Sequence, residues 1–129
     1  MILKYKYLSF FIIGSLSFAF LQLVLFLILR QEIFVYINGK IMPLFLFLAL
    51  IFFIIFSLLE IKKEAGYPLL ISLGMILGGG FSNFFDYLRL GGAADYLDFY
   101  FLRMNLADIF IFIGVVIFFS LKLANMKKV

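Results

Sequence analysis

Charged residues divide this chain into four long apolar stretches. Residues 7–29, 41–59 and 65–85 contain no charged side chain, and residues 104–121 contain only Asp108. A helix needs roughly 20 mostly apolar residues to cross a bilayer. The pattern therefore predicts an all-α integral membrane protein with four transmembrane helices. We place these helices at about 8–29, 41–60, 67–86 and 106–122.

We expect a single membrane domain over residues 1–129, because no soluble unit separates from the predicted helices. The longest connection is a loop at about 87–105. The first apolar stretch could be a signal peptide, but it is longer than the apolar region of one. It also ends in Leu-Arg-Gln rather than in a small-residue cleavage site. We therefore assign it to the mature protein as a helix.

Composition supports the membrane assignment and excludes several kinds of chemistry. The chain is 67% hydrophobic and 14% charged, whereas a soluble domain is nearer half apolar and a quarter charged. It contains no cysteine, histidine or tryptophan. Disulfides, thiolate nucleophiles, histidine-based catalysis and metal sites built on Cys or His are thus excluded. We expect no cofactor and no metal, so catalysis would depend on carboxylates, amides, Lys, Tyr or backbone.

The basic residues indicate how the helices are oriented. In a membrane protein, Lys and Arg concentrate on the cytoplasmic side, so we do not interpret the net charge of +4 as nucleic-acid binding. Four crossings place both termini on one side. That side holds seven basic residues and the other side four, which favours cytoplasmic termini and an outward-facing 87–105 loop. The seven are Lys4, Lys6, Lys62, Lys63, Lys122, Lys127 and Lys128, and the four are Arg30, Lys40, Arg89 and Arg103.

Polar side chains gather around the 87–105 loop. All four aspartates of the chain lie within 23 residues, from Asp86 to Asp108. Asp108 lies at membrane depth, where an ionisable residue is costly and points to function. Asn105 precedes it by three residues, so the two side chains share a helix face, and Asn105 can also cap the last helix. Asn83 and Asp86 repeat this spacing.

Two converging carboxylates that share one proton can activate water and protonate a carbonyl, as in aspartic proteases. This chemistry needs neither histidine nor metal. Other interpretations of the same residues remain open. Asp86 could simply end its helix at the headgroups, Asp95 and Asp98 could be solvated loop residues, and Asn105 could be only a cap.

Three segments resemble the signature of the signal peptidase II family of bacterial lipoprotein signal peptidases. In that family they read Gly-Gly-Ala-x-Gly-Asn-x-x-Asp-Arg, Gly-x-Val-Val-Asp-Phe and Phe-Asn-x-Ala-Asp. Here they are Gly78-Gly79-Gly80-Phe81-Ser82-Asn83-Phe84-Phe85-Asp86-Tyr87, Gly91-Gly92-Ala93-Ala94-Asp95-Tyr96 and Met104-Asn105-Leu106-Ala107-Asp108. Their order and internal spacing agree with the family.

The resemblance implies an aspartic endopeptidase with Asp95 and Asp108 as its catalytic dyad. It implies supporting roles for Asn83, Asp86 and Asn105. The implied partners are membrane lipid and a prolipoprotein whose cysteine bears diacylglycerol, with cleavage just before that cysteine. The implied location is the bacterial plasma membrane, with the site at the outer face.

The chain departs from the family pattern in helix 1 and outside the helices. The family's helix-1 Asp-Gln pair is Leu21-Gln22 here, and Leu25 stands at the place of a nearby Lys. Tyr87 replaces an Arg, and only Asn38 could match the motif before helix 2. The outer regions leave little room for the family's extracytoplasmic sheet. The alternative functions are those of a catalytically inactive relative that binds lipoprotein or signal peptide, and of a small four-helix transporter.

Overall fold

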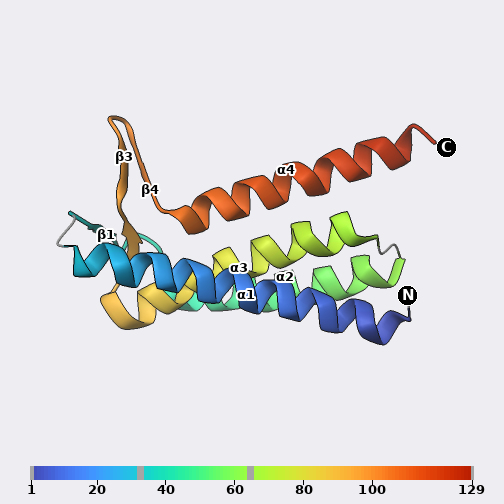
Figure 1. The fold of residues 1–129 in the computed structure, drawn as a ribbon, viewed down its shortest axis with the longest axis horizontal. Coiled ribbons are helices and arrows are strands. Elements are labelled where there is room, and N and C mark those ends of the chain that lie inside the picture. Colours follow the sequence, from blue (N-terminus) through green and yellow to red (C-terminus); the bar gives the residue numbers. More distant parts are fainter. Residues whose placement is uncertain (1, 32–33, 64–65, 129) are drawn as a thin grey trace.

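Four long helices form the body of the computed structural model, which describes residues 2–31, 34–63 and 66–128 (Figure 1). They are α1 (Leu3–Arg30), α2 (Pro43–Lys63), α3 (Tyr67–Leu90) and α4 (Leu106–Met126). Each is long and apolar enough to cross a membrane. The predicted class, an all-α protein with four membrane-spanning helices, is confirmed. The start of α1 and the end of α4 lie at the same end of the bundle (Figure 1).

All four helices extend beyond their predicted bounds at one end or both. α1 begins five residues before position 8, at Leu3, and α3 continues four residues past Asp86, to Leu90. Apolarity marks the part of a helix that meets hydrocarbon, whereas helical hydrogen bonds continue into the headgroup region. α3 stops at Gly91, whose φ of 81° is the left-handed conformation that commonly ends a helix. The Gly91 N–H donates to the Tyr87 carbonyl oxygen at 3.1 Å.

α3 is the central helix, and small residues let its neighbours approach it closely. It packs mainly against α1 and α4, and less against α2. A Cβ on Gly78 would lie 2.4 Å from Cβ of Ser17 in α1, and one on Gly114 of α4 would lie 2.7 Å from the Ser72 carbonyl oxygen. Such close backbone contact is the usual packing mode between helices in lipid, where apolar surface gains nothing by leaving the lipid.

Four short strands lie at the end of the bundle where α1 and α3 end. They are β1 (Tyr36–Asn38), β2 (Ala93–Asp95), β3 (Leu97–Phe99) and β4 (Leu102–Met104). β1 pairs antiparallel with β2, and β3 with β4, as two separate two-stranded sheets. The expectation of little room for a sheet was wrong in this respect, because strands of three residues fit into short connections.

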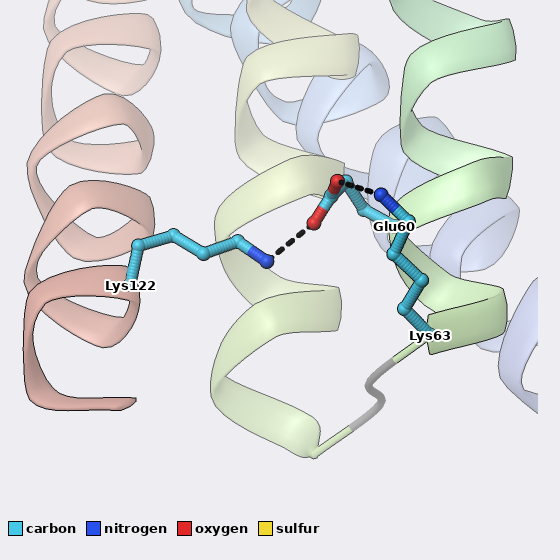
Figure 2. Close-up of polar contacts among 3 residues, drawn as sticks. All are labelled: Glu60, Lys63 and Lys122. Atoms are coloured by element: carbon cyan, nitrogen blue, oxygen red, sulfur yellow. Dashed lines mark hydrogen bonds and ion pairs between the residues drawn. The ribbon is translucent and has the colours of Figure 1, made fainter. Parts of the chain in front are cut away.

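At the opposite end of the bundle, an ion-pair cluster links α2 to α4 (Figure 2). Glu60 of α2 has a side chain that is only 10% exposed. One of its carboxylate oxygens is ion-paired with Lys122 of α4, and the other lies 3.3 Å from Nζ of Lys63. The Lys63 side chain is 70% exposed and that of Lys122 is 28% exposed. The Lys122 pair is therefore the more sheltered of the two.

Candidate active site

The first turn of α4 is fixed by a reciprocal pair of hydrogen bonds between Asn105 and Asp108. The Asp108 N–H donates to Oδ1 of Asn105 at 2.9 Å, and the Asn105 N–H donates to Oδ2 of Asp108 at 3.1 Å. This is a capping box, which satisfies two backbone donors that a helix start leaves unpaired. Asn105 is thus a helix cap, as one interpretation held, but its side-chain amide has further partners.

Two asparagine amides bring Asp95 and Asp108 into one cluster. Nδ2 of Asn83, on α3, donates to Oδ1 of Asp108 at 3.0 Å. Nδ2 of Asn105 donates to Oδ1 of Asn83 at 2.9 Å and to Oδ1 of Asp95, at the end of β2, at 3.2 Å. The two carboxylates are thereby joined through a continuous chain of hydrogen bonds. Asp95 is not a solvated loop residue, since it is only 6% exposed.

The electrostatic environment of Asp95 favours its neutral form. Burial raises the pKa of its carboxyl, and the negative charge of Asp108 raises it further, to about 6. Hydrogen bonds from the side chains of Asn38 and Asn105 oppose this shift without cancelling it. Asp95 therefore holds a proton at a higher pH than an ordinary aspartate. Two nearby carboxylates of this kind share a proton because both cannot easily be ionised together.

Asp86 lies near the cluster and connects three other parts of the fold. It is 3% exposed, so it does not simply end its helix at the headgroups. Its Oδ1 accepts from Nε2 of Gln22, in α1, at 3.0 Å, and its carboxyl also accepts from the backbone N–H of Ala94 in β2. Nε2 of Gln22 also donates to Oγ of Ser82 at 2.9 Å. Asp86 thus holds the strand that carries Asp95.

Three residues of this region escaped the sequence analysis or had no assigned role there. Asn38 reaches Asp95 because Tyr36 of β1 pairs with Asp95 of β2. The Tyr96 hydroxyl accepts from the Leu106 N–H at 3.0 Å, and burial raises the pKa of that hydroxyl. The sequence showed Gln22 only as the glutamine of the family's Asp-Gln pair and gave it no role. No local motif reveals these contacts, although an amide within an apolar helix is a signal in itself.

The positions that depart from the family pattern have clear places in the structure. Leu21 and Leu25 are each 2% exposed and belong to the apolar core. The Tyr87 hydroxyl accepts from the Ile41 N–H at 3.2 Å, which ties α3 to the segment before α2. Among the described residues, no group of three or more Asp, Glu, His or Cys side chains could hold a metal ion.

Two of the open cavities that border the cluster differ in polarity. One, of about 370 Å³, is mostly polar and borders Asp95. The other, of about 210 Å³, is apolar, lies among α2, α3 and α4, and reaches Asn83. The first is lined by Tyr36, Asn38, Lys40, Asp95, Tyr100, Phe101 and Arg103. An extended polar backbone and an apolar segment could therefore approach the cluster from different directions.

Four helices that are long and apolar enough to cross a membrane, with two aspartates linked through hydrogen bonds at one end of the bundle, define a multi-pass membrane protein with a polar carboxylate site. Residues 4–123 match the family model Peptidase_A8, described as signal peptidase (SPase) II. The chain belongs to this family.

Several curated relatives are bacterial lipoprotein signal peptidases. That of Caldanaerobacter subterraneus subsp. tengcongensis is 38% identical over 66 residues, covering 50% of this chain and 44% of the relative. That of Streptococcus agalactiae serotype Ia is 41% identical over 71 residues, covering 51% and 46%. That of Aeromonas hydrophila subsp. hydrophila is 51% identical over 49 residues, covering 34% and 29%. The chain thus spans less than half the length of these curated relatives.

A solved structure shares the fold over nearly the whole chain. It is described as a bacterial membrane enzyme structure obtained by the in meso method at 2.3 Å resolution. The TM-score is 0.73, with 19% identity, and the match covers 93% of this chain and 90% of that one. At this identity the likeness concerns the fold alone.

Proposed function

We propose that this protein is an aspartic endopeptidase that removes signal peptides from diacylglyceryl-modified prolipoproteins. Family membership supports this proposal, as do relatives that are lipoprotein signal peptidases. The observation that carries it is the hydrogen-bonded connection of Asp95 to Asp108 through Asn83 and Asn105. A carboxylate pair is a hydrolytic device that needs neither histidine nor cysteine, and this chain contains neither.

The two aspartates have different roles in the proposed reaction. Both oxygens of Asp108 accept hydrogen bonds from N–H groups, the arrangement expected of an ionised carboxylate. Asp95, with its raised pKa, holds the shared proton. Asp108 takes a proton from water while the water oxygen bonds to the scissile carbonyl carbon. Asp95 donates its proton to the developing oxyanion.

Collapse of the tetrahedral intermediate completes the reaction. A hydroxyl of the gem-diol intermediate returns its proton to Asp95 as the carbonyl re-forms, the C–N bond breaks, and Asp108 gives its proton to the leaving nitrogen. The signal peptide leaves with a new carboxyl group, and the lipid-modified cysteine gains a free amine. Asn83, Asn105 and Asp86 are positioning residues, since they hold the dyad and the β2 strand.

Charge distribution supports a particular orientation in the bacterial plasma membrane. The bundle end that bears Glu60 and Lys122 carries most of the basic residues and would face the cytoplasm, together with both termini. Residues 1–129 would form one membrane domain, with the dyad at the outer face. A diacylglyceryl substrate then reaches the dyad without its acyl chains leaving the bilayer.

A gel-shift cleavage assay tests the proposal with purified protein and a diacylglyceryl-modified prolipoprotein. We expect cleavage by the wild type and loss of cleavage in Asp95→Asn and Asp108→Asn. Asp98→Asn is the matched control, because Asp98 lies in the same loop but its side chain is 62% exposed. Wild-type rates in either dyad variant would refute the assignment. Binding of substrate by folded wild type without cleavage would identify an inactive relative.

A further inference from the structure

The β3–β4 hairpin exposes an apolar tip. Its four consecutive residues are Phe99, Tyr100, Phe101 and Leu102, which we call the hairpin tip. Tyr100 is fully exposed and Phe101 is 95% exposed, while about half of Phe99 and Leu102 is exposed. A contiguous exposed apolar patch on a protein usually marks a surface that contacts a partner or a membrane.

The backbone of the hairpin tip makes this exposure more informative. Tyr100 has φ of 56° and is the one non-glycine residue with positive φ among those described. A bulky side chain in this left-handed region is strained, and glycine would occupy the position at lower cost. An aromatic residue is present instead, although it contacts little of this chain. Packing within the chain therefore does not account for an aromatic residue at this position.

The direction of the hairpin shows what its tip would meet. Figure 1 shows β3 and β4 running across the direction of the helices and projecting sideways beyond the start of α4. At about 3.3 Å per residue, the tip lies roughly 10–13 Å from the hairpin base. In a membrane protein, a segment that leaves the bundle sideways at the end of the helices lies over lipid, at the level of the headgroups.

We infer that the hairpin tip inserts into the headgroup–acyl interface of the bilayer. Aromatic residues are enriched at this depth because their rings are apolar and can still meet polar groups at an edge. α4 also exposes apolar side chains to the surroundings of the bundle, and Phe112 among them is 68% exposed. At the hairpin base, the Arg103 guanidinium lies 4.6 Å above the Tyr36 ring and 4.0 Å from Asp98, a polar boundary beside the apolar tip.

The hairpin also separates the two aspartates along the chain. Only Tyr96 lies between Asp95 and the start of β3. Asn105 follows the end of β4 directly, and Asp108 comes three residues later. Insertion of the tip would therefore anchor the segment between the two carboxyls at the membrane surface. This consequence for catalysis rests on the proposed function, whereas insertion of the tip does not.

The test uses the absence of tryptophan from the chain. Phe101→Trp provides a single tryptophan at an exposed position, and Tyr100→Trp is a second variant should the first fold poorly. Each full-length protein is reconstituted into phosphatidylcholine vesicles containing lipids brominated either near the headgroup or near the acyl-chain ends. Phe112→Trp, on the lipid-facing side of α4, is the depth reference.

We expect a blue-shifted emission from position 101 and stronger loss of fluorescence with bromine near the headgroups than near the chain ends. Position 112 should show relatively more quenching by the deeper bromines. Quenching of position 101 by aqueous iodide but not by either lipid would overturn the inference. Protection from both iodide and bromine would also overturn it, because the tip would then be covered by protein, such as a second copy of the chain.

Discussion

Asn83 and Asp108 are joined by a 3.0 Å hydrogen bond across 25 positions of the chain. The two Asn-x-x-Asp pairs consequently behave differently. Asn105 and Asp108 bond to each other within one helical turn. Asn83 and Asp86 diverge, since Asn83 reaches the catalytic candidates and Asp86 binds Gln22 and the β2 backbone. With the same spacing, Asn105 and Asp108 therefore cap a helix, whereas Asn83 and Asp86 bond to two different parts of the fold.

Replacing Asn83 by leucine should strongly reduce turnover. The change keeps the side-chain size but leaves Oδ1 of Asp108 without the Asn83 amide donor and Asn105 without one acceptor. A hydrogen bond to a charged group contributes about 1.5–3 kcal/mol. A loss of about 1.4 kcal/mol of transition-state stabilisation lowers the rate tenfold, so we expect kcat to fall about tenfold or more. Steady-state kinetics on lipid-modified substrate measures this, with Ser120→Ala, at an exposed position on α4, as control. A kcat equal to that of the wild type would contradict the role of Asn83.

The pH dependence of cleavage should reflect the titration of Asp95. The dyad works with one proton, and Asp95 keeps that proton up to a pKa of about 6. We therefore expect kcat/KM to decline as pH rises through this value. In Asp108→Asn, the like charge that contributes to the shift is absent, so the pKa of Asp95 should fall. Carbon-13 NMR of labelled aspartate can follow that carboxyl, and an unchanged or higher pKa in the variant would contradict the coupling.

The raised pKa of Asp95 also makes the free energy of unfolding depend on pH. Since the folded state binds the Asp95 proton more tightly than the unfolded state, this contribution is fully present below the ordinary aspartate pKa of 3.8. It is lost as pH rises through the folded-state value of about 6. Asp95→Asn should weaken this pH dependence of the free energy of unfolding, which thermal unfolding in detergent at a series of pH values would show.

Restoring the carboxylate that the family carries in helix 1 should not improve this protein. Leu21 is 2% exposed, and an aspartate there would be buried in the apolar core at a cost of several kcal/mol unless it were paired. We expect Leu21→Asp to lower the unfolding temperature and to reduce, rather than raise, activity. Leu21→Met is the control, because swaps that conserve volume cost less than about 1.5 kcal/mol. A more active, equally stable Leu21→Asp protein would contradict this expectation.

The cluster in Figure 2 allows a comparison of two lysines on one carboxylate. Removing a surface partner costs less than about 1 kcal/mol, whereas breaking a buried pair costs about 3–5 kcal/mol. Lys122 is more sheltered than Lys63 and comes from a different helix than Glu60. Lys122→Met should therefore lower the free energy of unfolding clearly more than Lys63→Met. Equal effects in unfolding measurements would show that the link to α4 contributes little.

The helices could be predicted from sequence because a bilayer admits few alternatives. Apolar stretches of the required length favour membrane-spanning helices, and all four predicted helices are present. The observed helix ends differ from the predicted ones by up to five residues, at Leu3. A helix ends where its backbone hydrogen bonds end, in the headgroup region, and not where its apolar residues end. The start of α4 was placed correctly since its cap can be recognised locally, in the spacing of Asn105 and Asp108.

The site was only partly accessible to sequence reasoning. Similarity to the family pointed to Asp95 and Asp108, and the structure joins them, while their catalytic roles stay a prediction. Asn38 could not be derived, because its contact depends on the register between two three-residue strands far apart in the chain. Gln22 likewise has its partners 60 and 64 positions away. Long-range pairs of this kind leave no periodic pattern in the sequence.

The partners of Gln22 have an implication for biosynthesis. Chains are made from the N-terminus onward, so α1 reaches the membrane when Ser82 and Asp86 have not yet been translated. During that interval the Gln22 amide lacks both acceptors that it has in the finished fold. A bare amide in hydrocarbon is costly. We therefore expect α1 to stay next to the insertion machinery, where water can form hydrogen bonds with the Gln22 amide. It should move fully into lipid only once α3 has been inserted and supplies Ser82 and Asp86 as acceptors.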